Sequence, residues 1–407
     1  MNPEDITAQN SRAPRIESIR VRNFRLLRDV NLKGLSSLAV FVGENGAGKS
    51  TFFQVFGFLK SALEGSVDSA LKDIGGYQEV AGRGHTDEPI IIKLQFKVPI
   101  TGKKRLVTYY LEIGSTKNNK PVVLREYLSY ALNGSSFYLM EFKQGNGYVV
   151  KDNDEPNAPG KGMTQTKESL GAPDILAIKG LGQFKRHKAA FGLRQLIENC
   201  HMSNLHITAA RQPVKTGITE HLSETGHNLP LVVQYLYNNK RDVFDRILQK
   251  FQKRIPGMSK AEAHQTEDRH VLLRFWDKNF SDPFLAPYMS DGTIKMFAYL
   301  VLLHDPNPHP FLCVEEPENQ LYPDLMPILV EEFRQYGRRG GQVFVSTHSP
   351  DFLNQVEPEE AYFMKKENGE TQIRPVSQNK LVVSLIEEGG SKLGYMWRQG
   401  LLGPENE

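Results

Sequence analysis

The stretch that decides the fold is Gly43-Glu44-Asn45-Gly46-Ala47-Gly48-Lys49-Ser50-Thr51. It fits the pattern G-x-x-x-x-G-K-[S/T], which is typical of a phosphate-binding loop. The apolar run 38–42 before it predicts a buried strand, and the run 51–59 after it predicts a helix. Strand, glycine loop and helix in this order point backbone N–H groups and a helix N-terminus at phosphate groups. A glycine-rich turn with an incidental lysine is the alternative interpretation.

Individual residues of the loop have predicted roles. Lys49 would reach the β- and γ-phosphates, and the Ser50 hydroxyl would bind Mg²⁺. The residues predicted to hold the nucleotide here are Gly43, Asn45, Gly46, Gly48, Lys49, Ser50 and Thr51.

The composition is that of a globular protein. The chain has 407 residues, of which 39% are hydrophobic and 24% charged, with a net charge of +3. A charge this close to zero gives no argument for nucleic acid binding, and no apolar run approaches the roughly 20 residues that span a bilayer. The first 15 residues are polar, and two cysteines form no disulfide framework or zinc pattern, so we expect a cytoplasmic protein without a membrane partner.

Period-two patterns dominate the first part of the chain. We expect a disordered lead-in over 1–14 and a strand over 16–32, with Ile19, Val21 and Phe24 facing inward. Residues 88–150 predict an antiparallel sheet, in which Asn146-Gly147 indicates a hairpin turn. The polar stretch 151–168 predicts a loop.

Helical patterns dominate from about residue 172 to residue 260. After that point strands are expected at 271–276, 311–314 and 342–346, and helices at 294–303 and 323–336. Alternating strands and helices favour parallel strands with crossover helices, so the fold is expected to be α/β and split around a middle insertion. The predicted segments are 1–14 (lead-in), 15–170 (N-terminal lobe with an antiparallel β-subdomain), 171–265 (helical insertion) and 266–407 (C-terminal lobe).

Two carboxylates, Glu315 and Glu316, end the apolar strand expected at 311–314. Ligands of open α/β sheets bind at the carboxyl ends of strands. One carboxylate there can hold Mg²⁺, and the other can polarise an attacking water. Because neighbours on an extended chain face opposite sides, we expect different roles for the two. A charged strand end in solvent is the alternative.

Two further polar positions lie next to apolar elements. His348 follows the strand expected at 342–346 and could contact the γ-phosphate, or serve only as a structural hydrogen-bonding group. Ser290-Asp291-Gly292-Thr293 precedes an apolar helix, where a serine is an ordinary N-cap. The functional alternative is that this helix N-terminus binds a phosphate of a nucleotide held by another subunit.

Together, and in this order, these motifs resemble the ATP-binding-cassette (ABC) ATPases of the SMC/RecF type. Within them the chain is most similar to the stand-alone bacterial ATPases related to the overcoming-lysogenization-defect (OLD) family. Gly43 to Thr51 match the Walker A loop of a P-loop NTPase, and Phe311 to Glu316 match Walker B with the catalytic glutamate. Ser290 and Gly292 match the signature motif, and His348 matches the switch histidine. The resemblance covers roughly residues 16–403 and implies a mixed sheet, an antiparallel β-subdomain and a helical lid.

The sequence departs from this pattern at two places, and its Q-loop is not clear. Glu315 stands where most cassette ATPases have an aspartate that binds Mg²⁺, and Tyr322 stands where a histidine is usual. Gln78 lies where the Q-loop belongs, although a surface polar residue is equally consistent with this position.

The resemblance implies a Mg²⁺-dependent ATPase in which two chains sandwich two ATP molecules, with higher oligomers as a further option. Lys49, Glu316 and His348 would act in catalysis, Ser50 and Glu315 would bind the metal, and Ser290 would act across the interface. Only 59 residues follow His348 and they contain no D-x-D pair, so we expect no Toprim nuclease in this chain. The segment 376–403 is expected to form one helix and a capping tail.

The output of such a switch would then lie elsewhere. We expect a sensor subunit of an anti-phage or DNA-repair complex, with a separate nuclease or toxin-like effector. The alternative is a RecF-like clamp that binds DNA through basic clusters at 185–188, 250–254 and 338–339, which solvated helix faces explain equally well. A transporter subunit is a further alternative, against which the signature motif and the large insertion argue.

Overall fold

The computed structural model describes residues 13–100, 102–116, 118–132, 134–150 and 165–403. The chain forms two compact units. Unit 1 comprises Met1–Cys200 and Tyr362–Pro375, and unit 2 comprises His201–Ala361 and Val376–Glu407. The predicted lead-in and most of the predicted loop 151–168 lie outside the described residues.

An eight-stranded antiparallel sheet is the largest element of unit 1, with the order β2-β1-β4-β5-β6-β7-β8-β9. Its strands are β1 (Ile16–Phe24), β2 (Leu27–Lys33), β4 (Ile90–Ile100), β5 (Lys103–Ser115), β6 (Pro121–Leu132), β7 (Ser135–Lys143), β8 (Asn146–Val150) and β9 (Gln165–Ser169). Along β4 the apolar positions are buried and those between them more open, which gives the sheet one packed face. The predicted antiparallel sheet is therefore confirmed.

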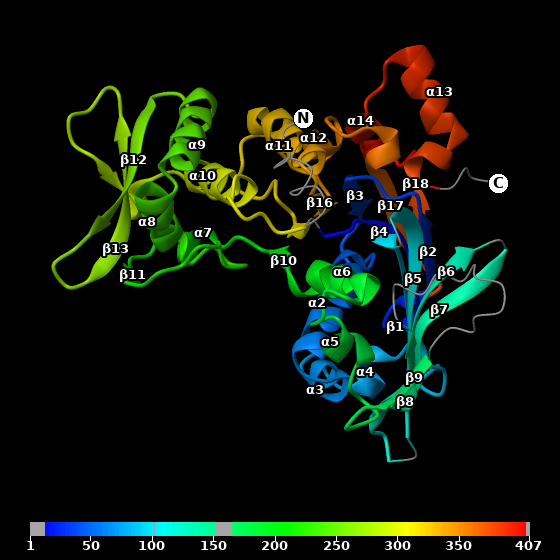
Figure 1. Cartoon of the computed structure of the whole chain (residues 1–407). Helices are drawn as coiled ribbons and strands as arrows, with labels where there is room; N and C mark the ends of the chain where they lie inside the picture. Colours follow the sequence, from blue (N-terminus) through cyan, green and yellow to red (C-terminus); the bar gives the residue numbers. More distant parts are fainter. Residues whose placement is uncertain (1–12, 101, 117, 133, 151–164, 404–407) are drawn as a thin grey trace. The chain divides into compact units, whose positions relative to one another are not determined.

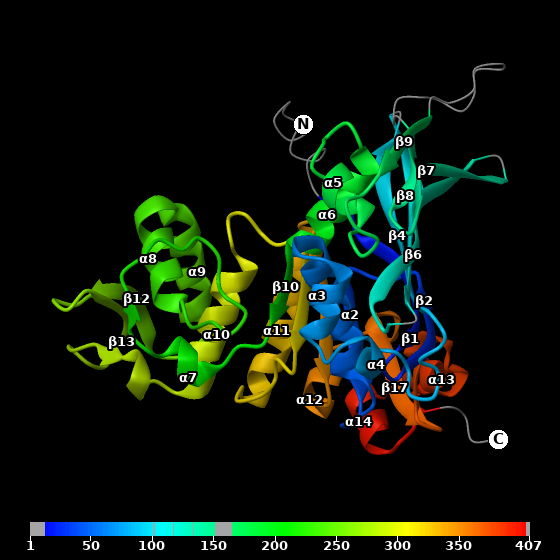
Figure 2. The ribbon, with the colours of Figure 1, turned by 90° about the horizontal axis from the view of Figure 1, so that it is seen from below.

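Helices cover one face of this sheet, as Figures 1 and 2 show for α2, α3, α5 and α6. The helices of unit 1 are α2 (Lys49–Glu64), α3 (Val67–Lys72), α4 (Tyr77–Val80), α5 (Ala177–Leu181) and α6 (Lys188–Glu198). Unit 1 also contains β3 (Leu38–Gly43), which lies next to β17 (Ala361–Glu367), and β17 pairs with β18 (Glu370–Pro375). All six residues of β3 are buried, as the apolar run predicts.

Two predictions in unit 1 need correction. The strand expected over 16–32 is a hairpin of β1 and β2, although Ile19, Val21 and Phe24 are fully buried as expected. The hairpin expected at Asn146-Gly147 turns two residues earlier, because Gln144 and Gly145 adopt the positive φ angles (48° and 81°) that a tight two-residue turn requires.

Unit 2 contains a parallel pair of strands, β15 (Phe311–Glu315) and β16 (Gln342–Thr347), joined by helix α11 (Met326–Arg338). A second, antiparallel sheet is formed by β11 (Val214–Lys215), β12 (Met258–Gln265), β13 (His270–Asp277) and β14 (Phe284–Leu285). Helices α8 (Leu229–Asn239) and α9 (Arg241–Arg254) lie beside β12 and β13 in Figure 1. The apolar face of α9 includes Val243, Phe244, Ile247 and Phe251, all of which are buried.

Unit 2 has six further strands and helices among its described residues. They are β10 (Cys200–Ser203), which begins at the unit boundary, α7 (Ile207–Ala210), α10 (Asp291–Leu303), α12 (Pro350–Leu353), α13 (Lys380–Gly389) and α14 (Leu393–Arg398). Short 3-10 turns occur at Ala286–Tyr288, Pro323–Leu325, Pro358–Glu360 and Val376–Gln378. Every residue of α10 from Thr293 to Leu303 is buried, which explains why its sequence is apolar on all sides.

Several elements were not predicted from the sequence. The strands β9, β12 and β18 are mostly polar, and alternation alone does not distinguish them from loops. The strand β17 begins with a short apolar run, Ala361 to Met364, which was not assigned to an element. The segment 376–403 forms two helices, α13 and α14, instead of one, because the αL glycine Gly390 ends α13. Among the described residues no helix is both long enough and apolar enough to cross a membrane.

Candidate functional site

The glycine loop connects β3 to α2 within unit 1, in the strand–loop–helix order that the sequence predicts. β3 ends at Gly43 and α2 begins at Lys49. Gly46 and Gly48 have φ angles of 81° and 101°, which residues with a Cβ rarely adopt. Gly48 is the N-cap and offers no capping side chain, and a helix N-terminus of this kind is suited to binding an anion.

The side chain of Lys49 turns back over the loop. Its Nζ donates to the carbonyl oxygens of Gly43 at 2.6 Å and Glu44 at 3.1 Å, and the residue is only 7% exposed. Neutral carbonyls are weaker partners for an ammonium group than a phosphate is, so a bound phosphate can replace them. Asn45, Gly46 and Ser50 are exposed and Thr51 is half-buried. The lysine ammonium, the exposed loop backbone and the two hydroxyls suit the binding of a nucleoside triphosphate and its metal ion.

Thr371, which follows Ala47 by 324 residues in the sequence, packs against this loop. The hydroxyl of Thr371, on β18, donates to the Ala47 carbonyl at 2.9 Å, and Thr371 is only 2% exposed. A Cβ added to Gly48 would meet the Thr371 hydroxyl at 2.2 Å, and one added to Gly43 would meet the Met364 carbonyl at 2.4 Å. Both glycines are therefore required by the close approach of the β17–β18 hairpin. No signal in the sequence marks Thr371.

In unit 2 the strands β15 and β16 end side by side. Glu315 pairs with Ser346 in the parallel register. Glu316 has already left the strand: its φ is 42°, and its N–H donates to the Ser346 carbonyl at 2.9 Å. Pro317 disfavours the right-handed helical conformation at the preceding residue. Residues other than glycine in sparsely populated φ/ψ regions, such as this left-handed one, are concentrated at functional sites.

The carboxylate of Glu316 contacts two side chains. Its Oε1 lies 3.1 Å from His348 Nδ1, and its Oε2 accepts from Asn319 Nδ2 at 2.9 Å. The structure thus brings together the two residues, Glu316 and His348, that the sequence singles out from different strands. It adds Asn319, whose place in Pro317-Glu318-Asn319 is visible in the sequence but whose contact is not.

Glu318 is buried and hydrogen-bonds to the residues that carry the His348 side chain. Its Oε1 accepts from the Thr347 hydroxyl at 2.6 Å and from the His348 N–H at 3.2 Å. It therefore fixes the backbone that carries His348. Trp397, on α14, donates from Nε1 to the His348 carbonyl at 3.3 Å. The sequence places Glu318 in the run Pro317-Glu318-Asn319 without giving it a role, and no signal in the sequence indicates Trp397.

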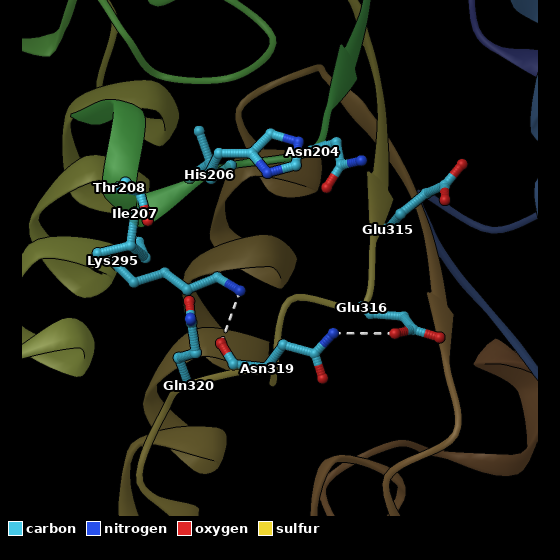
Figure 3. Close-up of a pocket in the computed structure, with 10 residues that line it drawn as sticks. Asn204, His206, Ile207, Thr208, Lys295, Glu315, Glu316, Asn319 and Gln320 are labelled. Carbon is cyan, nitrogen blue, oxygen red and sulfur yellow. Dashed lines mark hydrogen bonds between the residues drawn. The ribbon is translucent and has the colours of Figure 1, made fainter.

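A cavity of about 580 Å³ opens beside the two acidic residues within unit 2. Figure 3 shows its lining, in which Glu315 and Glu316 hold their carboxylates apart and Lys295 reaches toward Asn319. The other lining residues are Asn204, Leu205, His206, Ile207, Thr208 and Gln320.

Lys295 brings an ammonium group to the lining of this cavity and is only 3% exposed. Its Nζ donates to the Asn319 carbonyl at 2.7 Å. Burial lowers the pKa of Lys295 to about 8, against the opposing effect of Glu318 and Glu316. A single lysine within the apolar helix 294–303 is a signal that could have identified it from the sequence.

Ser290 is the N-cap of α10, and its side chain accepts from the Thr293 N–H at 3.3 Å. The residue is exposed. A Cβ on Gly292 would meet the Gln320 carbonyl at 3.2 Å, so the signature packs closely on the loop that follows Glu316. Arg211, at the end of α7, donates to the Met289 carbonyl and to Asp291, which holds the signature from the other side. Arg211 is another residue that the sequence did not reveal.

Gln78 lies in the short helix α4, where its amide donates to the Asn119 side chain at 3.3 Å in an exposed position. Its role as the Q-loop residue stays a prediction. The candidate residues thus form two groups, a phosphate loop within unit 1 and an acidic strand end with its signature helix within unit 2.

Two family models match the chain. The model described as "AAA ATPase domain" matches residues 15–263, more than half of the chain. The model described as "AAA domain, putative AbiEii toxin, Type IV TA system" matches residues 203–354. No curated protein is a significant match.

Solved structures of similar fold include SMC heads. An SmcHead bound to the C-winged helix domain of ScpA is 15% identical, with 89% of this chain and 97% of that chain covered and a TM-score of 0.50. The SMC head domain from Thermotoga maritima is 14% identical, with 89% and 98% covered and a TM-score of 0.43.

The first of these likenesses shows that the chain has the fold of an SMC head, which is a P-loop NTPase fold. With its glycine loop and its matched family model, the chain belongs to the AAA ATPase domain family and is an ATP-binding ATPase.

Proposed function

We propose that this ATPase is a Mg²⁺-dependent switch in which two copies of the chain close around ATP. One observation carries the proposal: Glu316, in a left-handed backbone conformation, holds its carboxylate against both His348 and Asn319. A carboxylate that two side chains hold in place at the end of a buried strand is suited to act as a general base, which must take a proton from one water molecule.

The phosphate loop supplies the binding half. Gly43, Asn45, Gly46, Gly48 and Thr51 provide backbone N–H groups and space for the phosphates, and the ammonium of Lys49 exchanges its carbonyl partners for phosphate oxygens. Ser50 and Glu315 would hold Mg²⁺. When bound, this ion would neutralise charge that develops on the phosphate oxygens.

The acidic strand end supplies the hydrolytic half. Glu316 accepts a proton from the attacking water, and Asn319 and His348 keep its carboxylate in place. His348 lies at a strand end, where it can respond to the loss of the γ-phosphate. Glu318 holds the His348 backbone, so a change at His348 is transmitted to Thr347 and β16.

Ser290 and Gly292 act on the ATP of the second copy. The exposed N-terminus of α10, a helix of 13 residues, is suited to binding an anion. Binding of the γ-phosphate then closes the dimer and hydrolysis opens it, which is a ligand-biased switch between two states.

A glutamine in place of Glu316 tests the proposal. Glu316→Gln keeps the size and the contact with Asn319 but cannot accept a proton, so turnover should fall by about 100-fold or more while ATP still binds. Light scattering with ATP should then show an accumulating dimer. The control is Glu359→Gln, which changes an exposed carboxylate elsewhere in unit 2 and should leave both readouts unchanged. Wild-type turnover in Glu316→Gln would remove Glu316 from the catalytic role.

We further propose that the switch acts in the cytoplasm on a separate effector protein, within a defence or repair complex. Two findings support this proposal: one matched family is described as a putative toxin of a type IV toxin–antitoxin system, and an SMC head of similar fold binds a domain of another protein. Turnover should therefore respond to a co-purifying protein from the native host. Strong, salt-sensitive stimulation by duplex DNA in the absence of that protein would instead support a DNA clamp.

A further inference from the structure

A cluster of metal-ligating side chains lies in unit 2, apart from the residues assigned to the ATPase. It consists of His221, Asp305 and His309, each of which offers one ligand atom, and these atoms all lie within 4.8 Å of one another. His221 precedes α8, whereas Asp305 and His309 lie in the connection from α10 to β15. The cluster is thus assembled by the fold from segments 84 residues apart.

The contacts within the cluster orient its ligands. His221 Nδ1 lies 2.7 Å from Asp305 Oδ2, while Asp305 Oδ1 accepts from the Asn307 N–H at 2.8 Å. One carboxylate oxygen is therefore held by the backbone and the other is directed at the histidine. The bond from Asn307 is of the outer kind that orients metal ligands in proteins.

The ring of His309 is held by its neighbours. His201 stacks on it with ring centroids 4.6 Å apart, and His221 packs at 5.2 Å. The Tyr336 hydroxyl donates to the His309 carbonyl. Pro306, Pro308 and Pro310 alternate with the loop residues and fix three φ angles, so little entropy is lost when this loop binds an ion.

We propose that His221, Asp305 and His309 bind one divalent transition-metal ion of the zinc class, with water in the remaining position. Ligand atoms bound at about 2.0–2.1 Å in a tetrahedron lie roughly 3.3 Å apart, so the present separations need only small side-chain rotations. Two imidazoles and one carboxylate suit Zn²⁺, Co²⁺ or Ni²⁺, and they differ from the oxygen-rich set that Mg²⁺ prefers.

The side-chain exposures fit a site that an ion can reach from solvent. The His221 side chain is 43% exposed, whereas the Asp305 side chain is 6% exposed. The ion would join the segment before α8 to the start of β15, the strand whose other end carries Glu315 and Glu316. Its expected effect is to stabilise unit 2, independently of how the nucleotide site works.

Co²⁺ titration of the chelator-treated, full-length chain without nucleotide tests the proposal. We expect visible absorption of tetrahedral or five-coordinate Co²⁺ at one ion per chain, and its loss when Zn²⁺ is added. Zn²⁺ should also raise the thermal midpoint of unfolding. His221→Ala and Asp305→Asn should each weaken Co²⁺ binding by about tenfold or more.

Two control variants make the outcome decisive. His227→Gln removes an exposed histidine near His221 in the sequence, and Glu315→Gln removes a proposed Mg²⁺ ligand; both should keep the Co²⁺ spectrum and its affinity. An absent spectrum in the wild-type chain would overturn the proposal. Equal affinity in His221→Ala, Asp305→Asn and the wild type would overturn it as well.

Discussion

At the scale of single residues, Glu316 shows how the site depends on backbone conformation. Alternation along an extended strand predicts that Glu315 and Glu316 face opposite sides, but Glu316 lies beyond β15 with a φ of 42°. Its direction is set by the turn into Pro317 and by its N–H bond to Ser346. The two acids differ because one lies in the strand and the other has left it.

His348→Ala should slow turnover without weakening ATP binding. The contact of His348 with the Glu316 carboxylate is 3.1 Å, and a hydrogen bond to a charged group contributes about 1.5–3 kcal/mol. We therefore expect turnover to fall roughly tenfold to a hundredfold, with ATP affinity changed by less than about threefold. Steady-state kinetics and a binding titration measure the two effects. His264→Ala, in β12, is the control, and an unchanged rate in His348→Ala would contradict the prediction.

Glu126 predicts a pH dependence of stability in unit 1. It is fully buried, and burial raises its pKa to about 7, although the N–H groups of Ala177 and Ile178 and the Tyr109 hydroxyl partly oppose this. The unfolded chain releases this proton near pH 4.5, whereas the folded chain keeps it to about pH 7. Stability therefore falls as pH rises through this window, by up to about 3 kcal/mol.

Glu126→Gln should remove that part of the pH dependence. Urea unfolding at a series of pH values from about 5 to about 8 measures it, and the variant should show a flatter decline than the wild type. The glutamine side chain would offer one oxygen instead of two to the three donors, which changes the stability of the variant at every pH. The prediction therefore concerns the slope of the free energy of unfolding against pH and not its absolute value. Glu387→Gln, on exposed α13, serves as the reference. A slope equal to that of the wild type would show that Glu126 does not titrate in this range.

At the scale of elements, the β17–β18 hairpin anchors the phosphate loop. Thr371 donates from its hydroxyl to the Ala47 carbonyl and from its N–H to the Leu26 carbonyl, so one residue of β18 joins the loop to the turn between β1 and β2. The close approach at Gly43 and Gly48 has the same origin. The loop motif is local in sequence, but its support comes from the other end of the chain.

Thr371→Val should weaken nucleotide binding. The variant keeps the shape of the side chain but leaves the buried Ala47 carbonyl without its hydroxyl donor, at a cost of about 1–3 kcal/mol. We expect ATP affinity to fall about tenfold, with smaller effects on turnover at saturating ATP. Thr371→Ser retains the hydroxyl and should bind nearly as well as the wild type. Equal affinities of the valine variant and the wild type would refute the anchoring role.

At the scale of the whole molecule, the proposed switch requires a second copy of the chain. Ser290 is exposed at the N-terminus of α10, and Arg211 and Gln320 hold the backbone around it. The backbone at this helix end thus has contacts within its own chain, while Ser290 itself is exposed.

Ser290→Arg should abolish ATP-dependent pairing while leaving ATP binding by the single chain nearly intact. A large cationic side chain at this N-terminus blocks the close approach of a second copy and opposes the positive end of the helix dipole. Light scattering with and without ATP, beside a nucleotide titration, separates the two effects. Ser281→Arg, which adds the same charge at another exposed position, is the control. Normal pairing in Ser290→Arg would exclude the signature helix from the interface.

Much of the site could be predicted from the sequence, because its motifs are local. The loop from Gly43 to Thr51, the apolar strands before Gly43 and Glu315 and the N-cap at Ser290 each depend on a few neighbouring residues, and their backbone follows from hydrogen bonding and sterics. Those patterns also determine the α/β class. Polar edge strands such as β9 and β18 carry no such local signal.

The tertiary structure alone decided the contacts between distant segments. Thr371 at the phosphate loop, Glu318 below His348, Arg211 at the signature and the cluster of His221, Asp305 and His309 all join residues that no spacing rule connects. The physical reason is that local propensity determines the direction of the backbone, whereas a side chain's partner depends on which elements pack together. The sequence by itself determined that this protein binds a nucleotide; the packing decided which side chains hold that machinery in place.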